Sequence, residues 1–270
     1  MASPVRPPAA YLGEGRVLVV TSAGVPVLAA ADDLGVTPGL VLDGTVDAGY
    51  GRFLERELYG GAVAVDVGAG IGLGTLAMAM AVHRPGRVVA FEPEPASFAL
   101  LRDSLAMNRE RGLVAEVVLR PEAVGAGVGQ AVLRTPSRQR ARSTTNPTTA
   151  LPAAASVDEV RVDVVTLDEA LRAMAVIDLV RIDVGGAEDD VLAGMTGLLD
   201  AQRVRLLDVH LCDVRAGATW TRLVSRLDHL VQEHEPATFT LDERGHRVPL
   251  SLDAAVHCDA VAHLVLELRS

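Results

Sequence analysis

Hydrophobic positions along the chain follow two alternating patterns, short continuous runs and helical spacing. Continuous apolar runs typical of parallel strands buried on both faces occur at residues 62–67, 87–91, 114–119, 178–184 and 205–209. Helical spacing of apolar residues follows at residues 73–82, 95–111, 191–199 and 219–234. This order of strands and helices predicts an α/β fold with a doubly wound, mostly parallel sheet.

The two ends of the chain and one internal segment depart from this alternation. Residues 237–241 and 260–268 are expected to close the sheet as a C-terminal antiparallel hairpin. Residues 1–60 are expected to hold a loose tail over residues 1–14, short strands and a cap helix, and residues 61–270 the ligand-binding domain. The low-complexity stretch within residues 136–158 is too long and polar for a tight connection, so we expect a mobile loop there.

Composition narrows the class of protein. The chain has 270 residues, 49% of them hydrophobic, which suits one large globular domain. A net charge of −10 argues against nucleic acid as the main partner, because phosphate binding needs a basic face. All 25 basic residues are arginine, which excludes lysine-based Schiff-base and P-loop chemistry. The sequence contains no run of about 20 apolar residues, so it predicts no membrane span. We expect a cytoplasmic protein.

A glycine-rich turn follows the first strand of the parallel series. The sequence Asp-Val-Gly-Ala-Gly-Ile-Gly at residues 66–72 places Gly68, Gly70 and Gly72 between a strand and a helix, where backbone and ligand approach closely. The dinucleotide spacing G-x-G-x-x-G fails here, and Asp66 at the strand end disfavours phosphate and favours a cationic or hydroxylated ligand. The pattern resembles motif I of class I S-adenosylmethionine (SAM) methyltransferases; another nucleotide and a purely structural turn are the alternatives.

Acidic residues and a histidine follow several other strands. Glu92 ends the second strand, where one carboxylate accepts hydrogen bonds from both ribose hydroxyls of a nucleoside. Glu122 follows the third strand, where it would accept a hydrogen bond from an adenine amino group. Asp183 and His210 end the next two strands. Because ligands of open α/β sheets lie beyond the carboxyl ends of the strands, we expect four strand-end side chains to converge: Asp66, Glu92, Asp183 and His210.

Taken together, the motifs resemble the FkbM-type SAM-dependent methyltransferase family over residues 63–214. They are the glycine turn, Ala-Phe-Glu-Pro at 90–93, Val-Thr-Leu-Asp at 165–168, Ile-Asp-Val-Gly-Gly-Ala-Glu at 182–188 and Leu-Asp-Val-His at 207–210. The resemblance implies a Rossmann-like class I methyltransferase fold, SAM as cofactor and O-methylation. The chain departs from the family pattern at Arg181, where a lysine is usual, and at Gly185, where a glutamate is usual.

We assign roles on this basis. His210 is the expected general base that deprotonates an alcohol, although a packed strand-end histidine is the alternative. Asp183 is the alternative base, or it holds the methionine end of SAM. The expected cofactor-binding residues are Asp66, Gly68, Gly70, Gly72, Glu92, Glu122 and Asp183. A Mg²⁺ site at Asp183, Asp208 and His210 is a further alternative, but we expect no metal. Five further histidines without a shared motif are expected at the surface or in packing: His229, His234, His246, His257 and His263.

The expected function is therefore O-methylation of a hydroxyl group on a small molecule, of the kind found among secondary metabolites such as polyketides, sugars and glycosides. Carboxyl methylation, SAM binding without turnover and, less favoured, an NAD-type oxidoreductase remain as alternatives. The expected partner is a small-molecule methyl acceptor, without nucleic acid or membrane, and a homodimer is one possible assembly.

Overall fold

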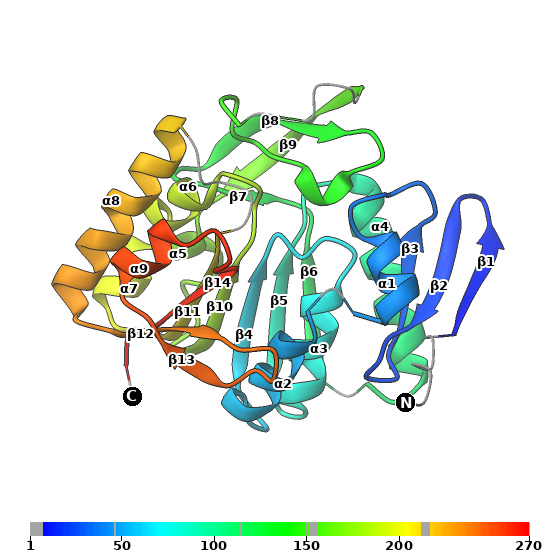
Figure 1. Ribbon diagram of the computed structural model, residues 1–270, viewed down its shortest axis with the longest axis horizontal. Helices are drawn as coiled ribbons and strands as arrows, with labels where there is room; N and C mark the ends of the chain where they lie inside the picture. Colours follow the sequence, from blue (N-terminus) through cyan, green and yellow to red (C-terminus); the bar gives the residue numbers. More distant parts are fainter. Residues whose placement is uncertain are drawn as a thin grey trace.

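The centre of the molecule is an eight-stranded sheet with the order β13-β12-β14-β11-β10-β4-β5-β6 (Figure 1). The computed structural model describes residues 8–45, 47–113, 115–149, 151, 156–211 and 217–269. Five neighbouring strands of this sheet run parallel. They are β4 (Val63–Val67), β5 (Arg87–Phe91), β6 (Glu116–Arg120), β10 (Ile177–Ile182) and β11 (Val204–His210). The predicted doubly wound, mostly parallel sheet is confirmed.

The C-terminal strands pair antiparallel with their neighbours, as expected. β14 (His263–Glu267) pairs antiparallel with β11, and β12 (Ala237–Leu241) pairs antiparallel with β14. The connection between β12 and β14 is longer than the single turn of a hairpin, because it contains β13 (Arg247–Pro249) and α9 (Leu252–His257). β13 adds to the outer edge of β12, so β14 inserts between β11 and β12.

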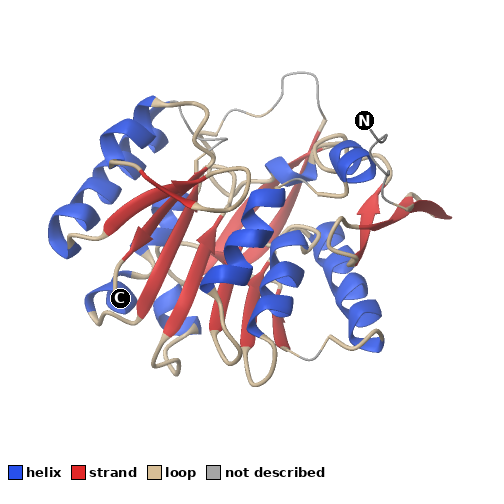
Figure 2. Cartoon of the chain, turned by 60° about the horizontal axis from the view of Figure 1, so that its bottom comes forward, coloured by secondary structure: helices blue, strands red, loops and turns tan. Residues whose placement is uncertain are grey.

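Helices cover both faces of the sheet, which explains the continuous apolar runs of the strands. On one face, Ala64 and Leu179 share a core with α2 (Ala48–Glu57), α3 (Leu73–Val82) and α4 (Pro95–Glu110). On the other face, Val65 and Val180 share a core with α5 (Leu167–Ala170), α6 (Glu188–Ala193), α7 (Thr196–Asp200) and α8 (Gly217–His234). Figure 2 shows the strands behind one of these helical layers. Adjacent residues of one strand thus belong to opposite cores.

A separate antiparallel sheet precedes the central one. It consists of β1 (Ala9–Gly13), β2 (Arg16–Val20) and β3 (Pro26–Ala30), and α1 (Thr37–Asp43) follows it. The expected strands are confirmed, but β1 lies where a loose tail was expected; residues 1–7 are outside the described part. α1 was not predicted, and proline and glycine in its first turn are residues that are also typical of turns.

A third sheet lies above the carboxyl ends of the parallel strands, at the top of Figure 1. Its strands lie side by side in the order β7 (Ala123–Val124), β9 (Val157–Val165) and β8 (Gly129–Pro136). The short helix η1 (Arg140–Arg142) comes after β8 in the chain. Thr144 pairs with Arg134 through both backbone groups, and the Asn146 side chain donates to the carbonyl of Gly186 (2.7 Å). The described part of the expected mobile loop is therefore held by contacts; residues 150 and 152–155 lie outside it.

Two smaller expectations concern the membrane and the cysteines. Among the described residues, no helix has the length and apolarity needed to cross a membrane. The two cysteines are too few for a disulfide framework, and as small apolar side chains they were expected in the core. That expectation is wrong for Cys258, which is exposed, and Cys212 lies outside the described residues.

Candidate functional site

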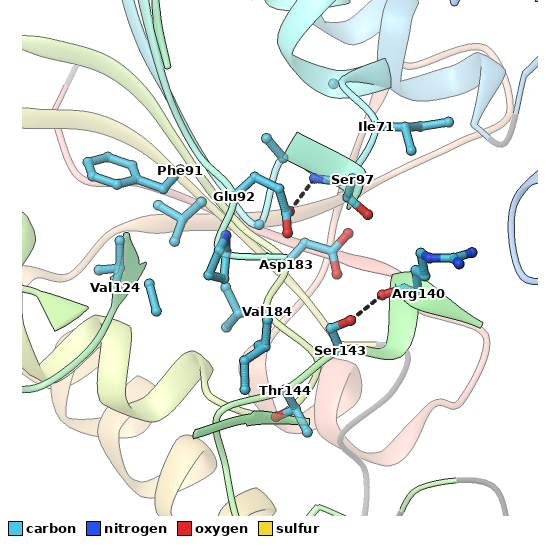
Figure 3. Close-up of a pocket in the computed structure, with 18 of the residues that line it drawn as sticks. Ile71, Phe91, Glu92, Ser97, Val124, Arg140, Ser143, Thr144, Asp183 and Val184 are labelled. Carbon is cyan, nitrogen blue, oxygen red and sulfur yellow. Dashed lines mark hydrogen bonds between the residues drawn. The ribbon is translucent and has the colours of Figure 1, made fainter. Parts of the chain in front are cut away.

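A pocket opens where the parallel strands meet the third sheet. Its walls come from the ends of β4, β5 and β10 and from residues 140–145, and it encloses about 950 Å³ including its open mouth. Figure 3 shows Glu92 and Asp183 in this pocket together with Arg140, Ser143 and Thr144. Of the predicted cofactor-binding residues, Gly68, Gly70, Glu92, Glu122 and Asp183 line it.

The glycine turn forms the floor of the pocket. Gly68 has φ +85°, and a Cβ atom there would overlap the carbonyl oxygen of Asp183 at the end of β10. Glycine is therefore required both by the left-handed backbone and by the close approach of the neighbouring strand. Gly70 donates its N–H to Glu92 Oε2 (2.6 Å), which joins the turn to the end of β5.

Glu92 is a buried carboxylate on the pocket wall, 6% exposed. Its Oε1 accepts a hydrogen bond from the N–H of Glu94 (2.8 Å), and burial raises its pKa to about 7. A ligand that donates hydroxyl groups to this carboxylate would offset the lost hydration of its charged form. This chemistry fits the ribose of SAM, so the residues present suit the expected cofactor.

Glu122 also lines the pocket, but its carboxylate already has a partner. Arg120 donates to both of its oxygens at 2.6–3.2 Å, and this guanidinium lowers the pKa of Glu122. The ion pair holds an ionised acceptor at the end of β6, which is compatible with the predicted contact to an adenine amino group. That contact remains a prediction.

Asp66, Gly72 and His210 are not among the described residues that line the pocket. The fully buried carboxylate of Asp66 accepts from Thr75 Oγ1 (2.6 Å) and from Arg181 Nη1 (2.9 Å). It lies behind the glycine turn and ties the start of α3 to β10. Gly72 precedes α3 as its N-cap. Asp66 therefore positions the turn through protein contacts, and direct ligand contact by Asp66 and Gly72 remains a prediction.

Arg181 links the two aspartates of the site. Its Nη1 contacts Asp66, and its Nη2 donates to Asp183 Oδ2. The other oxygen of Asp183 lies 3.3 Å from Nδ1 of His210. Burial raises the pKa of Asp183, but the Arg181 guanidinium and His210 outweigh this effect and hold that pKa well below its usual range. The structure thus brings the two predicted catalytic residues, Asp183 and His210, into contact.

His263 is buried, one of the two places expected for it, and it also has charged partners that the sequence did not indicate. It is 5% exposed, and its Nδ1 lies 3.0 and 3.1 Å from the two carboxylate oxygens of Asp208. Its Nε2 lies 2.8 Å from Asp47 Oδ2 at the N-terminus of α2. Asp183, Asp208 and His210, the alternative Mg²⁺ site, are not among the described residues whose potential ligand atoms lie close enough to share a metal ion. No sequence motif marks His263, because strand pairing alone brings it opposite His210.

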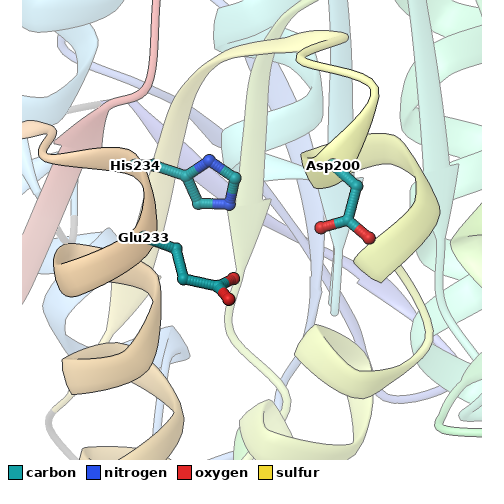
Figure 4. Close-up of side chains that lie close together, drawn as sticks. All are labelled: Asp200, Glu233 and His234. Atoms are coloured by element: carbon teal, nitrogen blue, oxygen red, sulfur yellow. The ribbon is translucent and has the colours of Figure 1, made fainter.

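Another group of side chains in the described part of the chain has metal-ligand spacing. Potential ligand atoms of Asp200, Glu233 and His234 lie within 4.8 Å of one another (Figure 4). Both acids are exposed, and the group lies just before β11 and at the end of α8, at the sheet edge away from the pocket. Such exposed acidic groups are common without a metal, and we assign no site here.

Arg140 lies in the stretch at residues 136–158 where the sequence predicted a mobile loop. It lines the pocket, and its Nη1 lies 3.0 Å from Asp32 in the loop after β3. The backbone N–H of Leu34 also donates to the carbonyl of Arg138 (2.7 Å). The N-terminal sheet therefore holds the segment that covers the pocket.

The departure from the family pattern at Gly185 has a structural reason. Gly185 has φ +61°, and a Cβ atom there would lie 2.8 Å from the carbonyl oxygen of Ser143. The backbone of the covering segment thus occupies the space that a glutamate side chain would need.

Replacement of Gly185 by alanine is expected to lower the free energy of unfolding by about 1–2 kcal/mol through the left-handed backbone alone. Displacement of Ser143 would add to this loss. Chemical denaturation measures it, with Gly127→Ala as the control, because a Cβ at Gly127 meets no atom within 4 Å. Equal stability of Gly185→Ala and wild type would contradict this account of the substitution.

Comparisons with known proteins agree with the family resemblance of the sequence motifs. The family model described as "Methyltransferase FkbM domain" matches residues 66–248. The comparison with curated proteins gives no significant match.

Solved structures resemble the chain at low sequence identity. Methyltransferase FkbM from Methylobacillus flagellatus KT has 14% identity and a TM-score of 0.47; the alignment covers 77% of this chain and 43% of that protein. A SAM-dependent methyltransferase from Agrobacterium tumefaciens has 11% identity and a TM-score of 0.49, covering 96% and 72%. A putative rRNA methylase from Clostridium thermocellum has 11% identity and a TM-score of 0.47, covering 80% and 92%.

The family match starts at the aspartate of the glycine turn and extends beyond β12. It covers more than half of the chain and contains every predicted cofactor-binding and catalytic residue. The chain therefore belongs to the FkbM family of SAM-dependent methyltransferases, as its sequence motifs predicted.

Proposed function

We propose that the protein transfers a methyl group from SAM to a hydroxyl group of a small molecule, with His210 as the general base. The observation that carries the proposal is the contact between Asp183 Oδ1 and His210 Nδ1 at 3.3 Å. An ionised carboxylate at Nδ1 holds the proton on that nitrogen, so Nε2 is the nitrogen that accepts a proton.

The chain's residues divide the work between binding and proton removal. Glu92 and the glycine turn bind the nucleoside, and Asp183 orients His210. When bound, SAM supplies a methyl group whose bond to sulfur breaks as its bond to the acceptor oxygen forms, with the electron pair left on sulfur. His210 Nε2 takes the hydroxyl proton in the same step and later releases it to water. Proximity and orientation of the two reactants supply most of the remaining rate enhancement over the uncatalysed reaction.

A small hydroxylated acceptor fits the charge of the protein. The net charge of −10 disfavours a polyanion such as RNA. Arg140 and the short polar side chains of Ser143 and Thr144 lie on the pocket wall, where they offer hydrogen bonds to a polar acceptor. A role in secondary metabolism belongs to this proposal as the expected source of such acceptors.

Carboxyl methylation is the second reaction that the pocket allows, and the product separates the two. A carboxylate acceptor is already deprotonated and needs no base. Methyl esters release methanol in mild alkali and methyl ethers do not. A product that loses its methyl group in alkali would overturn the proposed O-methylation of a hydroxyl group.

Titration with SAM tests the cofactor site directly. We expect micromolar affinity by calorimetry, no binding of NAD⁺ and a loss of about 10- to 100-fold in SAM affinity for Glu92→Ala, from hydrogen bonds to a charged group worth about 1.5–3 kcal/mol. Glu110→Ala at an exposed position of α4 is the control and should bind as wild type does.

Two results would contradict the proposal. NAD⁺ binding in place of SAM would favour the oxidoreductase alternative. SAM binding without S-adenosylhomocysteine formation across a panel of hydroxylated and carboxylated small molecules would favour a non-catalytic SAM-binding protein.

A further inference from the structure

His263 lies beside the proposed base with both of its ring nitrogens engaged. It pairs with His210 across β11 and β14, and the ring centroids are 5.2 Å apart at 70°. Asp208 accepts at Nδ1 (3.0 and 3.1 Å) and Asp47 at Nε2 (2.8 Å). Ionised carboxylates only accept hydrogen bonds, so both nitrogens of His263 must donate. This geometry requires the imidazolium form.

The surroundings of His263 support this protonation state. Burial lowers the pKa of His263, but Asp208 and Asp47 outweigh burial and raise that pKa to about 9. The ring of Tyr50 stacks on His263 with centroids 4.8 Å apart, which closes the cluster from the side of α2. Within the described part of the chain, the titratable and charged groups around the two histidines include Asp47 and Tyr50 at the start of α2, Asp208 of β11, and Arg181 and Asp183 at the end of β10.

The positive charge of His263 disfavours protonation of the adjacent His210. Protonation of His210 would place a second positive charge 5.2 Å from that of His263, which is unfavourable. Asp183 acts in the opposite direction on His210, but Arg181 already neutralises part of its charge. A base must be neutral to accept a proton, so the cation at His263 favours the active form of His210.

We propose that His263 is a positioning residue of the methyltransferase site, held as an imidazolium between Asp208 and Asp47 so that the adjacent His210 remains neutral and able to accept a proton. The inference rests on the proposed function of His210 as base. It extends that function to three residues, His263 of β14, Asp208 of β11 and Asp47 at the N-terminus of α2.

The test is a titration of His210 by NMR with labelled histidine, its signal assigned by its loss in His210→Asn. In His263→Asn the amide replaces Nδ1 opposite Asp208 but carries no charge. We expect the pKa of His210 to rise by about one unit in this variant, because the loss of a nearby cation favours protonation. The acid limb of the pH profile of kcat/KM should move upward by the same amount.

His257→Asn is the matched control, because His257 is exposed on α9 and contacts Asp253 of the same helix. Its substitution should leave the titration of His210 unchanged. An unchanged or lowered pKa of His210 in His263→Asn would overturn the proposal.

A second measurement uses the wild-type protein and does not depend on the folding of a variant. The ¹⁵N shifts of His263 at pH 7.5 should show two protonated nitrogens, and a neutral tautomer would overturn the proposal. Neither NMR measurement needs a methyl acceptor. Failure of the proposed function would appear as absent turnover, whereas failure of this inference would appear in the two histidine titrations.

Discussion

Replacement of His210 by asparagine is expected to lower kcat for a hydroxyl acceptor by about 10²–10⁴-fold, the usual contribution of general-base catalysis. Asparagine retains a side chain that can donate to Asp183 but has no basic nitrogen. The affinity for SAM should stay within about twofold of wild type, since His210 is not among the described residues of the cofactor pocket. Single-turnover formation of S-adenosylhomocysteine measures the rate, and calorimetry measures the affinity.

The control for His210 is His229→Asn. His229 is exposed on α8, and its Nε2 lies 3.3 Å from Glu233 of the same helix. Its substitution should leave kcat unchanged. A full rate for His210→Asn with a hydroxyl acceptor would assign the base to Asp183, the alternative that the sequence leaves open.

Replacement of Arg181 by methionine is expected to lower the free energy of unfolding by about 3–5 kcal/mol at pH 7, the cost of leaving buried charge without its partner. Arg181 contacts Asp66, which is fully buried, and Asp183. Methionine fills similar space but cannot neutralise either carboxylate. Because Asp66 supports the glycine turn, SAM affinity should fall as well.

The pH dependence of this loss has a defined sign. Arg181 and His210 depress the folded-state pKa of Asp183, so the stability from this contact is complete above the usual aspartate pKa of about 4 and is lost as the pH falls below it. The difference between wild type and Arg181→Met should therefore be largest above about pH 5 and shrink in more acidic solution. Chemical denaturation at pH 4 and pH 7 measures this difference.

Arg87→Met is the matched control. Arg87 forms an exposed ion pair with Glu116 at the opposite end of the sheet strands, and such pairs contribute about 0–1 kcal/mol. A loss for Arg181→Met as small as that of Arg87→Met would show that Asp66 and Asp183 do not depend on Arg181.

Much of the central sheet could be predicted from local sequence. β5 and α3 were predicted with the observed bounds, because a short apolar run between polar residues and a helix ended by proline and glycine are local signals. The predicted helix at residues 191–199 is instead two short helices, α6 and α7, separated at Gly194. Gly194 leaves no room for a Cβ atom beside the carbonyl of Gly125, a contact that no local pattern reports.

The candidate site likewise contains residues that local sequence predicts and residues that it does not. The glycine turn, Glu92, Asp183 and His210 could be named from the sequence, since each follows a predicted strand and parallel strands end at one edge. The role of Asp66 as a support for the turn could not be named, because its partner Arg181 lies 115 residues away. Arg140 enters the pocket only because the third sheet folds over the parallel strands.

The sequence by itself determined the family, the parallel strands and the chemistry at their ends, because hydrophobic period, glycine spacing and strand-end residues are local properties. Only the tertiary structure decided which charges neutralise one another and how the pocket is covered. Asp208 and His263 are 55 residues apart, and Asp47 and His263 are 216 apart. Such pairs depend on strand order and register, which long-range packing sets and no short stretch of sequence encodes.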